Sequence, residues 1–153
     1  MEPMTALREE TVEKLQDLIE VNNDSCEGFK TASDQVNEDA LANLFAQLAQ
    51  DRAGFSAELQ NYVRLNDETP DDDASARGTA HRLWLKVRAA INGGDAKVIL
   101  IELERMEDKI KHTYEEVLEE TGGALHDALQ RQYTQVKAGH DRVRDLRDSY
   151  LDR

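Results

Sequence analysis

Cysteine, proline and aromatic residues are all scarce in this sequence, and each shortage narrows the possible folds. The single cysteine, Cys26, cannot form an internal disulfide, so a disulfide framework is excluded and a reducing, cytoplasmic environment is expected. Two prolines and an aromatic share of 5% are typical of long helices rather than of a β-sandwich. Because no run of roughly 18 apolar residues occurs, the sequence predicts neither a membrane-spanning helix nor a membrane partner.

Basic residues are few relative to acidic ones. The chain has 19 basic and 32 acidic residues, which gives it a formal net charge of −13. Such an acidic protein would be repelled by the nucleic-acid backbone, so no nucleic-acid partner is expected. Every arginine in the segment 140–148 lies beside an aspartate, and this alternation indicates a solvated helix face.

Apolar residues recur at steps of three and four over most of the chain, which predicts an all-α fold. The predicted helices cover about 5–33, 38–65, 75–92, 95–120 and 123–151, with an acidic, proline-containing linker at 66–74. Asn37 and Asp95 are the expected capping residues at two helix starts, and Gly122-Gly123 is an expected stop. At 153 residues the chain fits one domain, 1–153.

Four of these helices have about 26 to 29 residues, whereas the helix at 75–92, which carries Trp84, is shorter. We assign this short extra helix to a long crossover between the second and third long helices. Short hinges are expected at the other two junctions. This connectivity is that of a ferritin-like four-helix bundle.

Four segments carry a family resemblance: Cys26-Glu27-Gly28-Phe29, Asp51 to Leu59 (DRAGFSAEL), His81-Arg82-Leu83-Trp84 and Gln132 to Val143 (QYTQVKAGHDRV). On these segments the chain resembles an uncharacterised bacterial ferritin-like four-helix-bundle family, a domain of unknown function. The resemblance covers nearly the whole chain and implies the same crossover topology. It implies no substrate, partner or catalytic residue.

Ferritin-like enzymes bind two irons with a glutamate from each of two helices and a Glu-x-x-His pair from each of the other two. The pair works because positions i and i+3 lie on one helix face, so both side chains reach the same ions. In this chain the residues three positions before His81, His112, His126 and His140 are Gly78, Lys109, Gly123 and Lys137. The signature is absent at all four histidines, so no catalytic residue, metal ligand or cofactor is expected.

Helical rotation places several polar residues near the middle of the expected bundle. Arg52 falls near the centre of the apolar stripe of its helix, where its permanent positive charge would occupy the space that a di-iron centre needs. We therefore expect a hydrogen-bonded central layer in which Arg52 pairs with Glu107 or Asp51. The members of this layer are Asn22, Arg52, Glu107, Gln132 and His140. The glutamates Glu13, Glu20 and Glu27 are expected on the solvent side of the first helix.

Two alternatives to this hydrogen-bonded central layer stay open. One is a degenerate site for iron or manganese, and its candidate ligands are Asp51, Glu58, Glu107 and His140. The other is an apolar small molecule in the bundle interior, which would require a cavity beside Gly54 or Gly139.

The missing ligand set favours a non-enzymatic ferritin-like bundle that acts as an interaction or stress-associated protein. We expect it to form a homo-oligomer, with a dimer favoured, through an apolar strip of its long helices. The stress association rests on analogy with ferritin-like proteins. The alternative function is a metal-dependent oxidoreductase or iron-storage protein that uses the degenerate site.

Overall fold

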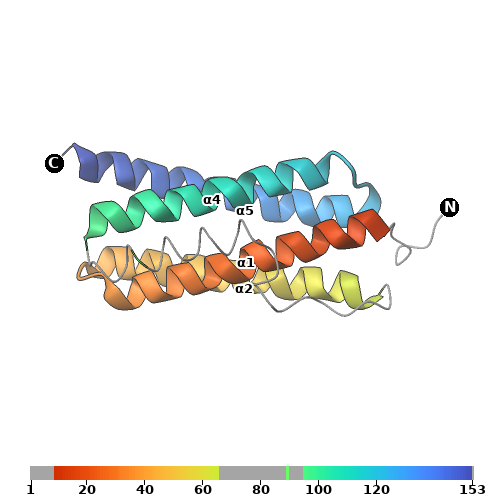
Figure 1. The fold of residues 1–153 in the computed structure, drawn as a ribbon, viewed down its shortest axis with the longest axis horizontal. Coiled ribbons are helices and arrows are strands. Elements are labelled where there is room, and N and C mark those ends of the chain that lie inside the picture. The colour runs from red at the N-terminus through yellow and green to blue at the C-terminus, as the bar shows by residue number, and fades with distance from the viewer. Residues whose placement is uncertain (1–8, 66–88, 90–94, 153) are drawn as a thin grey trace.

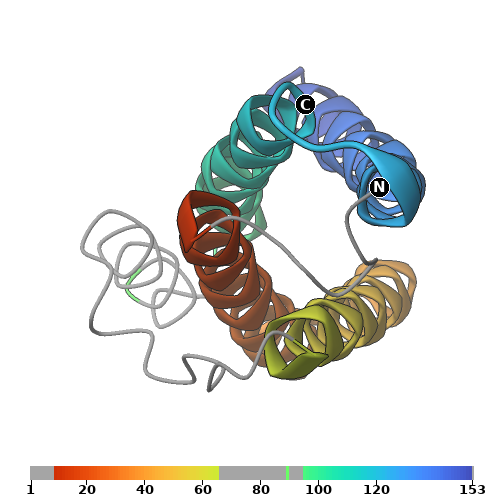
Figure 2. The same ribbon diagram turned by 90° about the vertical axis from the view of Figure 1, so that its right-hand side faces the viewer.

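The computed structural model describes residues 9–65, 89 and 95–152. In this part of the chain the fold is all-α, with four long helices and no strand. The helices are α1 (Glu9–Gln35), α2 (Asp39–Leu65), α4 (Ala96–Leu118) and α5 (Gly123–Leu151), and they pack lengthwise as in a bundle (Figure 1). Seen end-on, they occupy the corners of a square in which α2 and α4 lie opposite each other (Figure 2).

Two expected elements fall outside the described residues: the linker at 66–74 and the short helix at 75–92 with Trp84. Only Ala89 of this short helix is described, and it is helical. Residues 5–8, at the expected start of the first helix, also fall outside them. None of the described helices has the length and apolar character that a membrane span requires.

The helix ends follow from local chemistry. Asp95 is the N-terminal cap of α4, where its Oδ1 accepts a hydrogen bond from the backbone N–H of Lys97 at 2.9 Å. Between α4 and α5, Gly123 has a φ of +66°, a left-handed conformation that favours glycine. At the hinge between α1 and α2, the Ser33 hydroxyl donates to the carbonyl of Ala42 at 2.7 Å. These contacts fix the two short connections.

The apolar core consists of two clusters that lie end to end. One cluster uses the first half of α1 and the second halves of α2 and α4, together with the start of α5; Leu15, Leu59 and Leu129 are among its fully buried members. The other uses the opposite ends of the same helices and includes Phe29 and Leu103. Between the two clusters, near the middle of every helix, the buried side chains include polar ones. The fold therefore places a polar layer at its centre.

Helix α1 buries more of its surface than one apolar stripe predicts. Glu13 and Glu27 are exposed, as expected, but the prediction for Glu20 is wrong, because this residue is only 1% exposed. Leu18 and Val21, which lie beside the main stripe, are buried as well. The buried surface of α1 is therefore wider than its apolar stripe.

Candidate functional site

The centre of the polar layer is an ion pair between Arg52 of α2 and Glu107 of α4. Both side chains are 0% exposed. Arg52 Nη2 donates to Glu107 Oε1, and Arg52 Nε donates to Glu107 Oε2 over 3.4 Å. Because α2 and α4 occupy opposite corners of the bundle (Figure 2), this pair crosses the bundle axis. Of the two partners expected for Arg52, the structure selects Glu107.

The other two helices complete the surroundings of the pair. From α1, the Ser25 hydroxyl donates to Glu107 Oε2 over 3.4 Å. On α5, a Cβ added at Gly139 would lie 2.7 Å from Arg52 Nη2, so only glycine leaves room for the guanidinium there. The space beside Gly139, where a cavity was considered, is thus filled by the Arg52 side chain.

Aromatic rings provide further stabilisation of the buried charge. The Arg52 Cζ lies 6.0 Å from the centre of the Phe29 ring and 5.6 Å from that of Phe55. Arg52 Nη1 has no hydrogen-bond partner within the described structure. Attraction to the two ring faces offsets part of the cost of burying that donor. The positive charge at the centre of the bundle is therefore the Arg52 guanidinium, held by Glu107 and by the two rings.

A second set of polar contacts runs around the bundle next to this pair. Asn22 Nδ2 donates to the Tyr114 hydroxyl at 2.9 Å, and this hydroxyl donates to Gln132 Oε1 at 2.7 Å. Gln132 Nε2 in turn donates to Glu58 Oε1 at 2.6 Å. The series passes through α1, α4, α5 and α2 and thus joins all four helices. Burial raises the pKa of Tyr114 above its ordinary value, so its hydroxyl stays protonated and able to donate.

At the outer end of this series, Glu58 binds Arg131 of α5 through both carboxylate oxygens, at 2.7 and 3.3 Å. The hydrogen bond from Arg131 is the main reason that the pKa of Glu58 lies below its ordinary value. Glu58 is therefore a charged partner of Arg131 at the bundle surface.

The four candidate ligands of the degenerate metal site have separate partners. Glu107 is held by Arg52, Glu58 by Arg131, and the half-exposed Asp51 by Gln47 Nε2 at 3.0 Å. His140 lies against carboxylates of α4 and α5. Within the described residues, the only group of three side chains with metal-ligating geometry is Glu104, Asp108 and His140.

All five residues assigned to the central layer are buried: Asn22, Arg52, Glu107, Gln132 and His140. They divide into three sets of contacts rather than one. Arg52 and Glu107 form the pair across the axis, Asn22 and Gln132 belong to the series through Tyr114, and His140 contacts Glu104 and Asp108.

Sequence reasoning missed several polar residues at the same level of the bundle. Ser25 and Asp24 are buried on α1, and Asp24 Oδ2 has no hydrogen-bond partner within the described structure. Burial and the neighbouring charge of Glu27 raise the pKa of Asp24 to about 7. A signal for Glu104 and Asp108 did exist, because their spacing of four residues places both carboxylates on one helix face. Their contact with His140 depends on how α4 packs on α5, which the sequence does not reveal.

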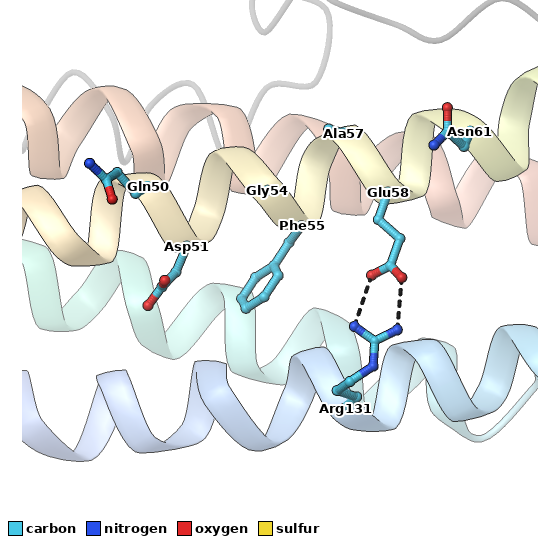
Figure 3. Close-up of a pocket in the computed structure, with 8 residues that line it drawn as sticks. All are labelled: Gln50, Asp51, Gly54, Phe55, Ala57, Glu58, Asn61 and Arg131. Atoms are coloured by element: carbon cyan, nitrogen blue, oxygen red, sulfur yellow. Dashed lines mark hydrogen bonds and ion pairs between the residues drawn. The ribbon is translucent and has the colours of Figure 1, made fainter.

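A groove with a volume of about 510 Å³ runs along the junction of α2 and α5. Figure 3 shows Phe55 pointing from α2 toward α5, and the Glu58–Arg131 pair joining the two helices. Gly54 lines the groove, and a Cβ added there would meet nothing within 4 Å. Gly54 thus borders open space at the surface, whereas Gly139 is packed in the interior. The lining residues are Gln50, Asp51, Gly54, Phe55, Ala57, Glu58, Asn61 and Arg131.

A family model described as a domain of unknown function, DUF2383, matches residues 10–120 of the chain. The match covers more than half of the sequence, so the chain belongs to the DUF2383 family. No curated protein matches it.

Proposed function

We propose that this member of the DUF2383 family is a non-enzymatic ferritin-like helical bundle that acts through protein contacts, first of all with a second copy of itself. The observation that carries the non-enzymatic part is the buried pair of Arg52 and Glu107. A di-iron site in a four-helix bundle needs acidic side chains that converge on an empty centre. In this chain the carboxylate at the centre is neutralised by a guanidinium, and a metal cation placed beside it would be repelled by that fixed positive charge.

The order and direction of the helices support the ferritin-like part of the proposal. Helices α2 and α4 run in the same direction, so the end of α2 and the start of α4 lie at opposite ends of the bundle (Figure 1). Residues 66–95 join those two ends. In the ferritin-like connectivity a long crossover joins the second and third helices of the bundle in the same way.

For self-association, we assign the contact surface to the groove between α2 and α5. The apolar strip expected from the sequence is not a good candidate, because the exposed large hydrophobic residues among those described are only Val98 and Leu151. By contrast, α2 and α5 contact each other much less than α1 contacts α2, which leaves their junction open. Small residues at Gly54 and Ala57 allow another helix to approach closely.

A second copy fits this groove because a two-fold interface must be complementary to itself. Besides the internal Glu58–Arg131 pair, the groove carries the carboxylate of Asp51, so a two-fold axis can bring Asp51 of one copy next to Arg131 of the other. Charge pairing of this kind matters for a chain with a net charge of −13, whose copies otherwise repel each other.

Filling the groove at Gly54 tests this proposal. We expect the wild-type protein to sediment as a dimer and Gly54→Gln to sediment as a monomer, since the longer side chain occupies the contact surface. Neither Gly54→Gln nor the control Gly54→Ala should unfold the protein, because a Cβ at this position meets nothing within 4 Å. Replacing a helical glycine by alanine should add about 1 kcal/mol of stability.

Sedimentation equilibrium over a range of protein concentrations measures the mass of each variant. In Gly54→Ala the added methyl group is too small to fill the groove, so this variant should remain dimeric. A monomeric mass for the wild-type protein at the highest concentration, or a dimer of Gly54→Gln as tight as that of the wild type, would contradict the proposed surface.

A further inference from the structure

A group of potential metal ligands lies between α4 and α5, apart from the pair at the bundle centre. Glu104 and Asp108 are one turn apart on α4, and His140 of α5 faces them. Their ligand atoms all lie within 4.8 Å of one another. His140 Nε2 is 3.1 Å from Glu104 Oε1 and 3.4 Å from Asp108 Oδ1.

These separations suit ligands of one metal ion. Two ligand atoms bound to the same Zn²⁺ at about 2.1 Å, with an angle of about 90–110° between them, lie roughly 3.0–3.4 Å apart. The separation of 3.4 Å between His140 Nε2 and Asp108 Oδ1 is also longer than an ordinary hydrogen bond. Both distances from Nε2 therefore match shared coordination.

The imidazole of His140 is surrounded by more acceptors than a neutral ring can satisfy. Its residue is only 5% exposed, and its Nδ1 lies 3.0 Å from Asp141 Oδ1. A neutral imidazole has one N–H, and when Nδ1 donates it to Asp141, the lone pair of Nε2 points at Glu104 and Asp108. In that tautomer three electron-rich atoms converge on one point, an arrangement that a bound cation would stabilise.

The basic side chains nearby leave that point open. Arg147 Nη1 binds the other oxygen of Glu104, Oε2, at 3.0 Å, and His112 Nδ1 lies 3.4 Å from the other oxygen of Asp108, Oδ2. Lys137 and Arg144 contact Asp141 at 3.2 and 3.4 Å. Arg147 and His112 thus contact the outer oxygens of Glu104 and Asp108, which leaves Glu104 Oε1 and Asp108 Oδ1 directed at Nε2.

We propose that Glu104, Asp108 and His140 bind a divalent transition-metal ion, of the class of Zn²⁺ or Mn²⁺, that links α4 to α5. One imidazole with two carboxylates is a suitable donor set for these ions. Asp141 takes the role of the carboxylate that orients a metal-bound histidine through its other nitrogen. Because the Asp108 side chain is 46% exposed, solvent supplies the entry path and the remaining ligands. This site is independent of the proposed function, since it shares no residue with the groove or with the central pair.

Isothermal titration of untagged protein with ZnCl₂, and separately with MnCl₂, tests the site. We expect one ion per chain for the wild-type protein. His140→Gln and Asp108→Asn should each weaken binding at least tenfold, and Asp141→Asn should weaken it roughly 10- to 100-fold by releasing the imidazole. Asp108→Asn changes a half-exposed side chain, so this variant should keep its fold, and circular dichroism of each variant confirms its helix content.

His112→Gln is the matched control, because it removes the exposed histidine next to Asp108 and leaves the three ligands in place. It should bind the ion as the wild type does. Absence of binding to the wild-type protein would overturn the proposal. The same conclusion would follow if the Asp108 and His140 variants bound as tightly as the wild type, or if His112→Gln lost binding.

Discussion

Replacing Glu107 by glutamine should lower the free energy of unfolding by about 3–5 kcal/mol, the usual cost of leaving one member of a buried ion pair without its partner. Arg52 would keep its charge in a position that is 0% exposed, where neither water nor another described carboxylate reaches it. A neutral amide oxygen and the two phenylalanine rings would replace the carboxylate as its stabilising partners. Urea denaturation followed by circular dichroism measures the change.

The double variant Arg52→Met with Glu107→Leu provides the control for this prediction. Replacing a whole buried ion pair by apolar side chains of similar size is often neutral or stabilising. We therefore expect the double variant to be markedly more stable than Glu107→Gln alone. A single variant Glu107→Gln within about 1 kcal/mol of the wild type would show that Arg52 does not depend on this carboxylate.

Asp24 should make the protein less stable as the pH rises from 4 to 7. Its pKa is raised from 3.8 to about 7 because the side chain is buried and Glu27 lies nearby. In that window the folded state keeps a proton that the unfolded state has lost, so stability is highest at the acidic end and falls until the folded carboxyl ionises. About two pH units separate pH 5 from the folded-state pKa of about 7. The free energy of unfolding should therefore fall by roughly 2–3 kcal/mol between pH 5 and pH 8.

The variant Asp24→Asn isolates this contribution, since it carries no titrating proton. The difference in unfolding free energy between wild type and Asp24→Asn, measured at pH 5 and at pH 8, should shift in favour of the variant at pH 8. Asp34→Asn, on the exposed face of the same helix, is the control and should leave the pH dependence unchanged. Equal pH profiles of the wild type and Asp24→Asn would contradict the raised pKa.

The sequence predicted the four long helices and the burial of Arg52, because both depend on local periodicity. A stripe of apolar residues fixes which side of a helix is buried, and Arg52 lies on that stripe. Contacts between helices depend on how the elements pack, and there the sequence was less informative. It left Glu107 and Asp51 as equal partners for Arg52, and only the diagonal relation of α2 and α4 distinguishes them.

Two glycines illustrate the same limit. Gly54 and Gly139 look alike in the sequence, since both lie within a helix and both were considered as places for a cavity. In the structure Gly139 makes room for the Arg52 guanidinium, whereas Gly54 faces open space in the groove. Likewise, the rotation of α1 assigned Glu20 to solvent, whereas the structure buries this residue outside the apolar stripe.

The alternative function is a metal-dependent oxidoreductase or iron-storage protein. It requires a different arrangement of side chains at the centre of the bundle. It needs Glu107 to be free for an iron or manganese ion and Arg52 to lie elsewhere. The non-enzymatic proposal needs the opposite arrangement. The two proposals therefore differ in the position of one side chain.

A crystal structure of protein soaked with Fe²⁺ under anaerobic conditions, with anomalous data collected at the iron absorption edge, tests this point most directly. We predict that Arg52 stays paired with Glu107 and that no anomalous peak lies within bonding distance of the Glu107 carboxylate. An iron peak bound to Glu107, with the Arg52 side chain turned toward solvent, would contradict it.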